Sequence, residues 1–280
     1  MSPVQFLDAQ YCGKAIEDRS GKTSAEAAAM DLEKIKGIIA KDPQSLLETS
    51  PAGLSVLHYA VSHPENLALV KYLLSFGKLD LEATDSKQWT PLFVAINAGC
   101  DDIATLLIEK GAKTDARDKE GTTALILAAK AGNLPLVKIL GKNKKACDLA
   151  GRNGWRALDR AIMSRRETVV EALLAMGASY EYKVEGGYSP LYVAVLAMSP
   201  KLVKLFLDKK LPVNEVSADG ATALDYAEFM DSNPNECRSV QGNKEVIKIL
   251  LQHGAKLEKF KGAGWWKILA VLLSLGLSVF

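Results

Sequence analysis

The chain has few of the residues that form covalent or metal cross-links. Of its 280 residues four are cysteine and three are histidine. The cysteines are scattered without the spacing of a disulfide framework or a zinc site, which favours an intracellular, reducing compartment. The sequence also lacks an Asn-x-Ser/Thr acceptor and an apolar N-terminal segment, and its early acidic residues argue against a transit peptide. These absences exclude a small disulfide-stabilised secreted domain.

Motifs for catalysis are missing as well. No Gly-x-Ser-x-Gly, no Cys–His pairing pattern and no paired carboxylates stand out. The Gly-Lys-Thr-Ser run at 21–24 resembles a phosphate loop, but residue 16 is Ile where that loop needs Gly. We therefore predict that the chain is not an enzyme and has no catalytic, cofactor-binding or metal-binding residues.

What the chain does contain is an internal repeat. Each copy has a polar turn with a glycine, a short apolar helix, a break and a second helix, as in residues 118–140. One leucine marks the copies with a spacing of 35 and then four times 33 residues, at Leu57, Leu92, Leu125, Leu158, Leu191 and Leu224. A recurrence at this period predicts a stack of helix pairs in which each repeat contacts only its neighbours.

These units resemble ankyrin repeats, whose signature is a glycine turn followed by Thr-Pro-Leu-His-x-Ala. The signature reads QWTPLFVA at 88–95, GTTALILA at 121–128 and GYSPLYVA at 187–194. The resemblance covers roughly residues 24–257 and implies an all-α ankyrin-repeat solenoid of about seven helix pairs with β-turn fingers. Residues 1–23 are then an N-terminal extension, 258–264 a basic, glycine-containing linker and 265–280 a hydrophobic C-terminal helix.

Several repeats depart from the signature. His58 occupies its histidine position, where the resemblance implies support of a neighbouring turn, and Asp159 and Asp225 are interpreted as polar substitutes there. If the degenerate opening repeat at 24–48 is counted as the first, Arg165 and Met198 replace the glycine between the paired helices of repeats five and six, so we expect less tight turns. The polar, Asn- and Pro-containing sequence at 229–242 predicts a loop inserted in repeat seven.

The resemblance places binding in a concave groove lined by one finger residue and one helix-end residue per repeat. Aromatic anchors with nearby arginines are typical of interaction hot spots. The alternative is that Trp89 and Trp155 only pack over adjacent turns. The predicted partner-binding residues are Trp89, Asn97, Lys130, Arg152, Trp155, Arg156, Arg160, Met163, Tyr188, Leu196 and Phe229.

Charge is unevenly distributed along the chain. Residues 121–166 hold ten basic and two acidic side chains, a net of +8, so the remainder of this +2 chain sums to −6. Either these cations form an ordinary solvated face, or they attract an acidic protein surface or anionic lipid. No nucleic-acid-binding module is visible, so nucleic acid is not an expected partner.

The C-terminal segment is different in character. Residues 268–280 carry no charge, and a helix that is apolar on all sides is buried in protein or in lipid. A helix over 265–280 would be about 24 Å long, which is short for a bilayer core of about 30 Å. Three alternatives stay open: a cap on the last repeat, a membrane contact, or a helix buried in a partner. Its predicted membrane or helix contacts are Trp265, Trp266, Lys267, Ala270, Ser274 and Ser278.

The expected function is that of a non-catalytic scaffold or adaptor that binds a protein partner through its concave face. One alternative is a structural accessory subunit of a membrane-bound complex, held by residues 265–280. Another is a soluble inhibitor of a target protein.

Overall fold

The computed structural model describes residues 2–11, 24–218, 220–232 and 240–257. In these residues the structure is helical, with two isolated β-bridges and no strand. This confirms the predicted all-α stack of helix pairs. The chain divides into two compact units, residues 1–131 with 138–140 and residues 132–137 with 141–280.

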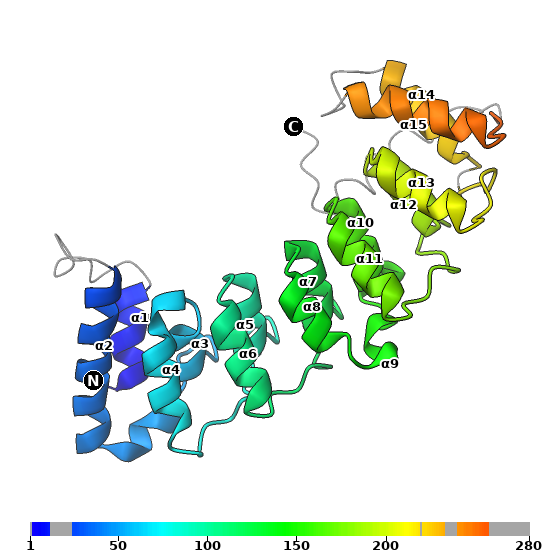
Figure 1. The fold of residues 1–280 in the computed structure, drawn as a ribbon. Helices are drawn as coiled ribbons and strands as arrows, with labels where there is room; N and C mark the ends of the chain where they lie inside the picture. The colour runs from blue at the N-terminus through cyan, green and yellow to red at the C-terminus, as the bar shows by residue number, and fades with distance from the viewer. Residues whose placement is uncertain (1, 12–23, 219, 233–239, 258–280) are drawn as a thin grey trace. The chain divides into compact units, whose positions relative to one another are not determined.

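In unit one, short helices follow one another as antiparallel pairs that stack side by side (Figure 1). Helix α3 packs against α4 and α5, and α5 packs against α6 and α7. The helices are α1 (Pro3–Tyr11), α2 (Ser24–Lys41), the 3₁₀ turn η2 (Pro43–Leu47), α3 (Val56–Ala60), η3 (Pro64–Asn66), α4 (Leu67–Leu74), α5 (Pro91–Asn97), α6 (Asp101–Glu109) and α7 (Ala124–Ala131).

The opening repeat begins earlier than residue 24. Helix α1 packs against α2 and α3, and its Val4, Phe6 and Leu7 side chains are buried. Since α1 takes the place of an inner helix and α2 that of an outer helix, part of the predicted N-terminal extension belongs to the first repeat. Residues 12–23 of that extension lie outside the described residues.

Unit two continues the same architecture. Helix α10 packs against α11 and α12, α12 against α13 and α14, and α15 against α13 and α14. The bounds are α8 (Leu134–Leu140, divided between the two units), α9 (Lys144–Cys147), η4 (Arg152–Gly154), α10 (Ala157–Met163), α11 (Glu167–Ala175), α12 (Pro190–Leu196), α13 (Pro200–Asp208), α14 (Ala223–Ser232) and α15 (Val240–Gln252).

Local sequence explains where the inner helices start. At α5 the Thr90 hydroxyl accepts a hydrogen bond from the Phe93 N–H, and Ser189 caps α12 in the same way. Proline follows each cap, at the first helical position, where its missing N–H is not needed. The leucine that marks each repeat comes next, and all six of these leucines are at most 2 % exposed. They form the repeated core between helix pairs.

The turns inside repeats five and six contradict the prediction that they are less tight. Arg165 and Met198 adopt the left-handed conformation, with φ of 52° and 49°, as Gly99 does with φ of 72°. The closing hydrogen bond is also kept: Cys100 N donates to Ala95 O at 2.9 Å, and Arg166 N to Ala161 O at 2.9 Å. Packing of the two helices imposes the turn even where the residue is not glycine.

The described residues test the predicted loop of the last repeat but not the predicted linker and C-terminal helix. The expectation of a loop over 229–242 is wrong at both ends, because α14 extends to Ser232 and α15 begins at Val240; residues 233–239 lie outside the described part. The linker 258–264 and the hydrophobic helix 265–280 are likewise outside it. Among the helices of the described residues, none combines the length and the apolar composition that a membrane span requires.

Candidate protein-interaction surface

Six finger turns share one hydrogen-bonding pattern. In each, the first residue's N–H donates to the carbonyl of the fifth residue, as from Asp85 to Trp89 at 3.1 Å and from Gly151 to Trp155 at 2.8 Å. The fourth residue has a positive φ, such as 73° at Gly121 and 61° at Gln88. Glycine is frequent here because a side chain disfavours this conformation.

Hydrogen bonds also join neighbouring fingers within each unit. Ser86 N donates to Ala52 O at 3.0 Å in unit one, and Ala218 N donates to Gly186 O at 2.8 Å in unit two. These hydrogen bonds hold the tips of neighbouring fingers in a fixed register. Each unit therefore presents preorganised side chains, which lowers the ordering entropy lost on binding.

The signature histidine position has a structural role. His58 Nδ1 accepts from Ser55 N–H at 3.0 Å, so the ring's Nε2 donates to the Trp89 carbonyl of the next finger at 2.9 Å. Asp159 accepts from Arg156 N–H and Asp225 from Thr222 N–H, each at 2.8 Å. The interpretation of these aspartates as substitutes for histidine at the helix start is confirmed.

Trp89 lies on the finger of repeat three and is half-buried. Its indole N–H donates to Asp118 Oδ2 on the next finger at 3.3 Å, and the Lys87 ammonium lies 5.3 Å from its ring centre. The ring therefore packs over the adjacent turn, as the alternative interpretation held, and still offers part of its surface. Asn97 and Lys130, at the ends of α5 and α7, are exposed in the same unit.

Three predicted contact residues are not available to a separate partner. Trp155 is 3 % exposed, Tyr188 5 % and Leu196 8 %. The Arg160 guanidinium lies 5.2 Å from the Trp155 ring centre, and the Tyr188 ring lies 4.8 Å from that of Tyr192. The prediction of exposed anchors at these positions is wrong, because large apolar side chains at the groove positions gain more by packing on neighbours than by facing water.

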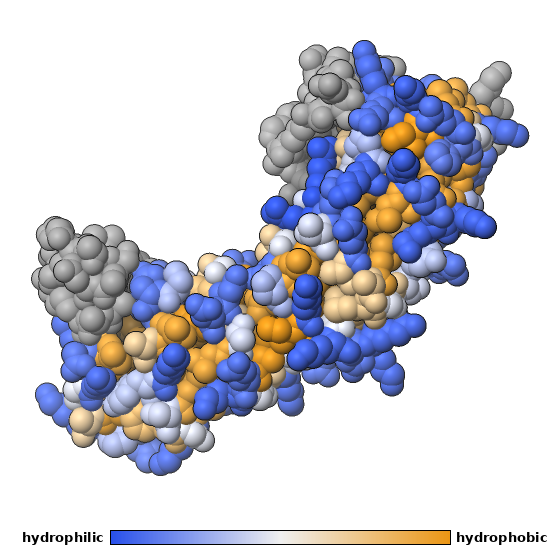
Figure 2. Space-filling view, in the orientation of Figure 1, coloured by the Kyte–Doolittle hydropathy of each residue, from blue (hydrophilic) through white to orange (hydrophobic). Residues whose placement is uncertain are grey.

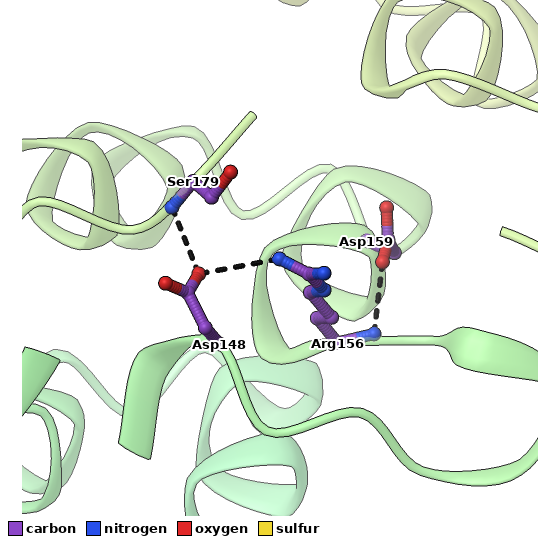
Figure 3. A network of polar contacts seen from close by, with 4 residues as sticks. All are labelled: Asp148, Arg156, Asp159 and Ser179. Atoms are coloured by element: carbon purple, nitrogen blue, oxygen red, sulfur yellow. Dashed lines mark hydrogen bonds and ion pairs between the residues drawn. The ribbon is translucent and has the colours of Figure 1, made fainter. Parts of the chain in front are cut away.

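Arg156 belongs to a polar network rather than to a free surface (Figure 3). Its Nη1 atom lies 3.3 Å from Asp148 Oδ1, which also accepts the Ser179 N–H at 2.9 Å. The guanidinium plane stacks on Tyr182, 3.8 Å from the ring centre. Asp148 thus joins the loop before repeat five to the start of the next repeat, and Arg156 is held in place there.

Burial is the main influence on the ionisation of Asp159, which lies beside this network. Asp159 is fully buried, and burial raises the pKa of its carboxyl to about 6, against the lowering effects of the Arg156 N–H, Tyr182 and two guanidinium groups. Its Oδ1 atom and the Tyr182 hydroxyl have no well-aligned protein hydrogen-bond partner, although the two groups are near enough to affect each other's pKa. In unit one, burial lowers the pKa of His58 despite its bond to Trp89.

The remaining predicted residues are distributed over unit two. Arg152 is exposed, while Arg160, Met163 and Phe229 are half-buried. A cavity of about 360 Å³ that sequence reasoning missed is lined by none of them; its lining includes Tyr182, Lys209 and Glu215. These residues come from two consecutive fingers and the end of α13, a grouping without any sequence motif.

Lysines gather around α9. Lys142, Lys144 and Lys145, here called the lysine cluster, are all exposed, and Figure 2 shows hydrophilic residues concentrated around the position of α9. Within the described part of the chain no ion pair involves them. The two acids of the basic segment are unavailable, since Asp148 binds Arg156 and Ser179 and Asp159 is buried. The positive field of this cluster is therefore not neutralised by its own segment.

Features of other site types are few among the described residues. No group of three or more histidine, cysteine or acidic side chains there could hold a metal ion. Cys100 and Cys147 are free and buried, and burial raises the pKa of both thiols, to about 11 for Cys100. Neither is therefore an activated nucleophile at neutral pH. The predicted contacts Trp265, Trp266, Lys267, Ala270, Ser274 and Ser278 lie outside the described residues.

Comparison with known proteins gives a consistent result. A family model described as ankyrin repeats (three copies) matches residues 24–118 and 111–185. Mouse (Mus musculus) NF-kappa-B inhibitor delta is 28% identical over 249 residues, which are 78% of this chain and 73% of that protein. Human (Homo sapiens) protein phosphatase 1 regulatory subunit 27 is 41% identical over 91 residues, 32% of this chain. The match spans 58% of that human protein's length.

Among solved structures, the human ASB11 ankyrin repeat domain superposes with a TM-score of 0.67. It is 24% identical, and the match covers 85% of this chain and 100% of that domain. At this identity the likeness concerns the fold.

Proposed function

Because the chain belongs to the ankyrin-repeat family, we propose that it is a non-catalytic binding module for an acidic protein partner. Ankyrin repeats are protein-interaction modules. The proposal that the partner is acidic rests on the lysine cluster. Three exposed ammonium groups lie within four residues of sequence, and the acids of their own segment are engaged elsewhere. Such a patch raises the association rate of a negatively charged surface.

Neighbouring features of unit two extend this surface. Arg152 is exposed on the finger that follows α9, and Arg156 holds the intervening loop through Asp148. A fixed loop keeps its cations in one arrangement, so less side-chain freedom is lost when a partner binds. The partner we propose therefore contacts α9 and the repeat-five finger, rather than the buried Trp155 ring.

Charge reversal tests the proposal. The tagged full-length chain and a variant with Lys142, Lys144 and Lys145 changed to Glu are used to capture proteins from the native source. Proteins that bind through the cluster should be acidic and should be lost from the variant. Their recovery from the unchanged chain should fall as salt rises, because exposed charges are screened beyond about 8 Å at 0.15 M.

The matched control changes three exposed lysines of unit one, Lys110, Lys113 and Lys119, to Glu. Both variants have the same net charge, so a loss confined to the first identifies the surface. Recovery of the same proteins by all three chains would contradict the proposal.

A second candidate, inhibition of the bound target, is favoured by the similarity to mouse NF-kappa-B inhibitor delta. It predicts that adding the chain lowers the activity of a captured protein, and that the Lys-to-Glu variant does not. A role as accessory subunit of a membrane-bound complex stays a prediction and depends on residues 265–280.

A further inference from the structure

One side-chain hydrogen bond, here called the inter-repeat bond, recurs in both units. An acceptor oxygen in the loop before a finger binds the backbone N–H of the residue four positions after the end of the next outer helix. The pairs are Glu82 with the Lys113 N–H at 2.8 Å in unit one, and Asp148 with the Ser179 N–H at 2.9 Å (Figure 3) and Asn214 with the Lys256 N–H at 2.7 Å in unit two.

At repeat six the inter-repeat bond cannot form. Glu181 lies 33 residues after Asp148 and takes the acceptor position, while Pro212 lies 33 residues after Ser179 and takes the donor position. Proline has no backbone N–H, so it offers the carboxylate nothing to accept. Glu181 is exposed, and within the described part of the chain its carboxylate makes no hydrogen bond or ion pair.

A cavity lies where the bond is missing. Its volume is about 360 Å³, and its lining contains both Glu181 and Pro212. Tyr182 and Leu211, their neighbours in the sequence, add apolar surface to the lining. The volume is at the lower end of the range of ligand pockets, roughly 300–1,000 Å³.

The polar groups of the lining are incompletely paired. Glu215 Oε1 lies 3.4 Å from the Lys183 ammonium, whereas the Oε2 atom is buried and has no hydrogen-bond partner within the described residues. The Ser189 hydroxyl accepts the Tyr192 N–H at 3.4 Å, which leaves its own proton available to a second group. A buried acceptor without a donor costs free energy, so a ligand that supplies a donor is favoured.

The charges of the lining favour a neutral ligand. Two carboxylates, Glu181 and Glu215, accompany three lysines: Lys183, Lys209 and Lys210. A cationic ligand would meet the lysines, and an anionic ligand would meet the carboxylates. A peptide backbone carries no charge and presents N–H donors and C=O acceptors in alternation. It can therefore satisfy the carboxylates and the donors of this cavity together.

We propose that this cavity binds an extended segment of a partner polypeptide. Backbone N–H groups of the segment donate to Glu181 and to Glu215 Oε2, in place of the N–H that Pro212 lacks. A carbonyl of the segment accepts from the Ser189 hydroxyl, and an apolar side chain contacts Tyr182. This inference rests on the proposed function only in that the ligand is a protein; the acidity of that protein does not enter it.

Supplying the missing N–H should close the site. In Pro212→Ala the new amide can donate to Glu181, as Lys113 donates to Glu82, and so competes with a peptide for this carboxylate. Hydrogen exchange measured by NMR should show the new amide protected, and adding Glu181→Ala should remove the protection. Equally fast exchange in both variants would overturn the inference, because the proline would then not be what leaves Glu181 unpaired.

Binding is measured with peptides selected on the full-length chain from a phage-displayed library of random short sequences. The peptides are labelled with fluorescein, and fluorescence polarisation gives their affinities. Pro212→Ala and Glu181→Ala should each weaken binding about tenfold or more, because a hydrogen bond to a charged group is lost. Glu181 is exposed, so its replacement keeps the test valid even where circular dichroism shows that Pro212→Ala disturbs the fold.

The matched control is Glu82→Ala, which removes the carboxylate at the equivalent position of unit one and should leave peptide affinity unchanged. Peptides that bind all these chains equally would overturn the inference, and so would a selection that yields no binding peptide. Peptides that keep their affinity in Glu181→Ala but lose it when Lys209 and Lys210 are changed to Gln would show an anion site, which also overturns it.

The variant with Lys142, Lys144 and Lys145 changed to Glu separates this inference from the proposed function. It should bind the selected peptides as the unchanged chain does. Peptide binding that is lost in this variant and kept in Pro212→Ala would overturn the inference and leave the proposed function standing. Unchanged capture of proteins by the lysine variant, with peptide binding lost in Pro212→Ala, would contradict the proposed acidic partner and support the cavity.

Discussion

Two tryptophans at the same position of a finger have opposite surroundings. Trp89 in unit one is half-buried and shares its indole N–H with Asp118, whereas Trp155 in unit two is almost completely buried beneath Arg160. The inner helices differ in the same sense, with Asn97 exposed on α5 and Leu196 buried on α12. The repeat backbone provides identical positions, and the side chains decide whether a position is surface or core.

The largest contrast is expected from removing the two rings. Trp155→Ala should lower the free energy of unfolding by about 3–5 kcal/mol, because it leaves a cavity in packed surroundings. Trp89→Ala should cost less than about 2 kcal/mol, since part of its surface is already in water. Urea unfolding followed by circular dichroism measures both, and equal losses would refute the assignment of Trp155 to the core.

The buried capping carboxylate of unit two should make stability depend on pH. The pKa of Asp159 is about 6 in the folded chain against a usual value of 3.8. Between these values the folded state binds more protons than the unfolded state, so this group's contribution falls as pH rises, by about 3 kcal/mol in all.

Asp159→Asn tests this directly, because the amide oxygen can still accept the Arg156 N–H but does not titrate. Relative to the unchanged protein, the variant should gain stability from pH 4 to pH 7. Asp225→Asn, at the equivalent cap of the last repeat, is the control. Parallel pH profiles for the unchanged protein and Asp159→Asn would show that Asp159 does not carry the effect.

His58, at the same position in unit one, should act with the opposite sign. Its pKa is lowered by burial, so the unfolded state takes up the proton first, and stability is lost as pH falls below about 6.5. His58→Gln should cost about 1 kcal/mol at pH 7.5 through the lost helix cap. This difference should shrink at lower pH, and a difference that grows there would contradict the assignment.

A smaller effect separates backbone strain from packing in unit one. Gly99 has φ of +72° with open space where a Cβ would lie, so Gly99→Ala should destabilise by about 1 kcal/mol. Gly37, inside α2, also has open space but no positive φ, so Gly37→Ala should stabilise by about 0.5–1 kcal/mol. Thermal unfolding of the two variants measures both changes in stability. A change of the same sign in both variants would exclude the backbone explanation.

Much of the architecture follows from the repeat period. The six aligned leucines are at most 2 % exposed. His58 supports the neighbouring finger through the Trp89 carbonyl as expected, and polar side chains at the signature histidine position also accept a backbone N–H at the start of their own helices. These features depend on contacts within a few residues or with the adjacent repeat, so one sequence period contains the necessary information.

Other features depended on contacts that the period does not encode. Arg165 and Met198 keep a turn that their side chains disfavour, because the helices on both sides hold it. Trp155, Tyr188 and Leu196 occupy groove positions yet are buried. Asp148 binds both Arg156 and Ser179, and Ser179 lies 31 residues after Asp148 in the sequence. Burial is a property of all the atoms around a side chain, so which groove positions remain exposed was decided when the helices packed.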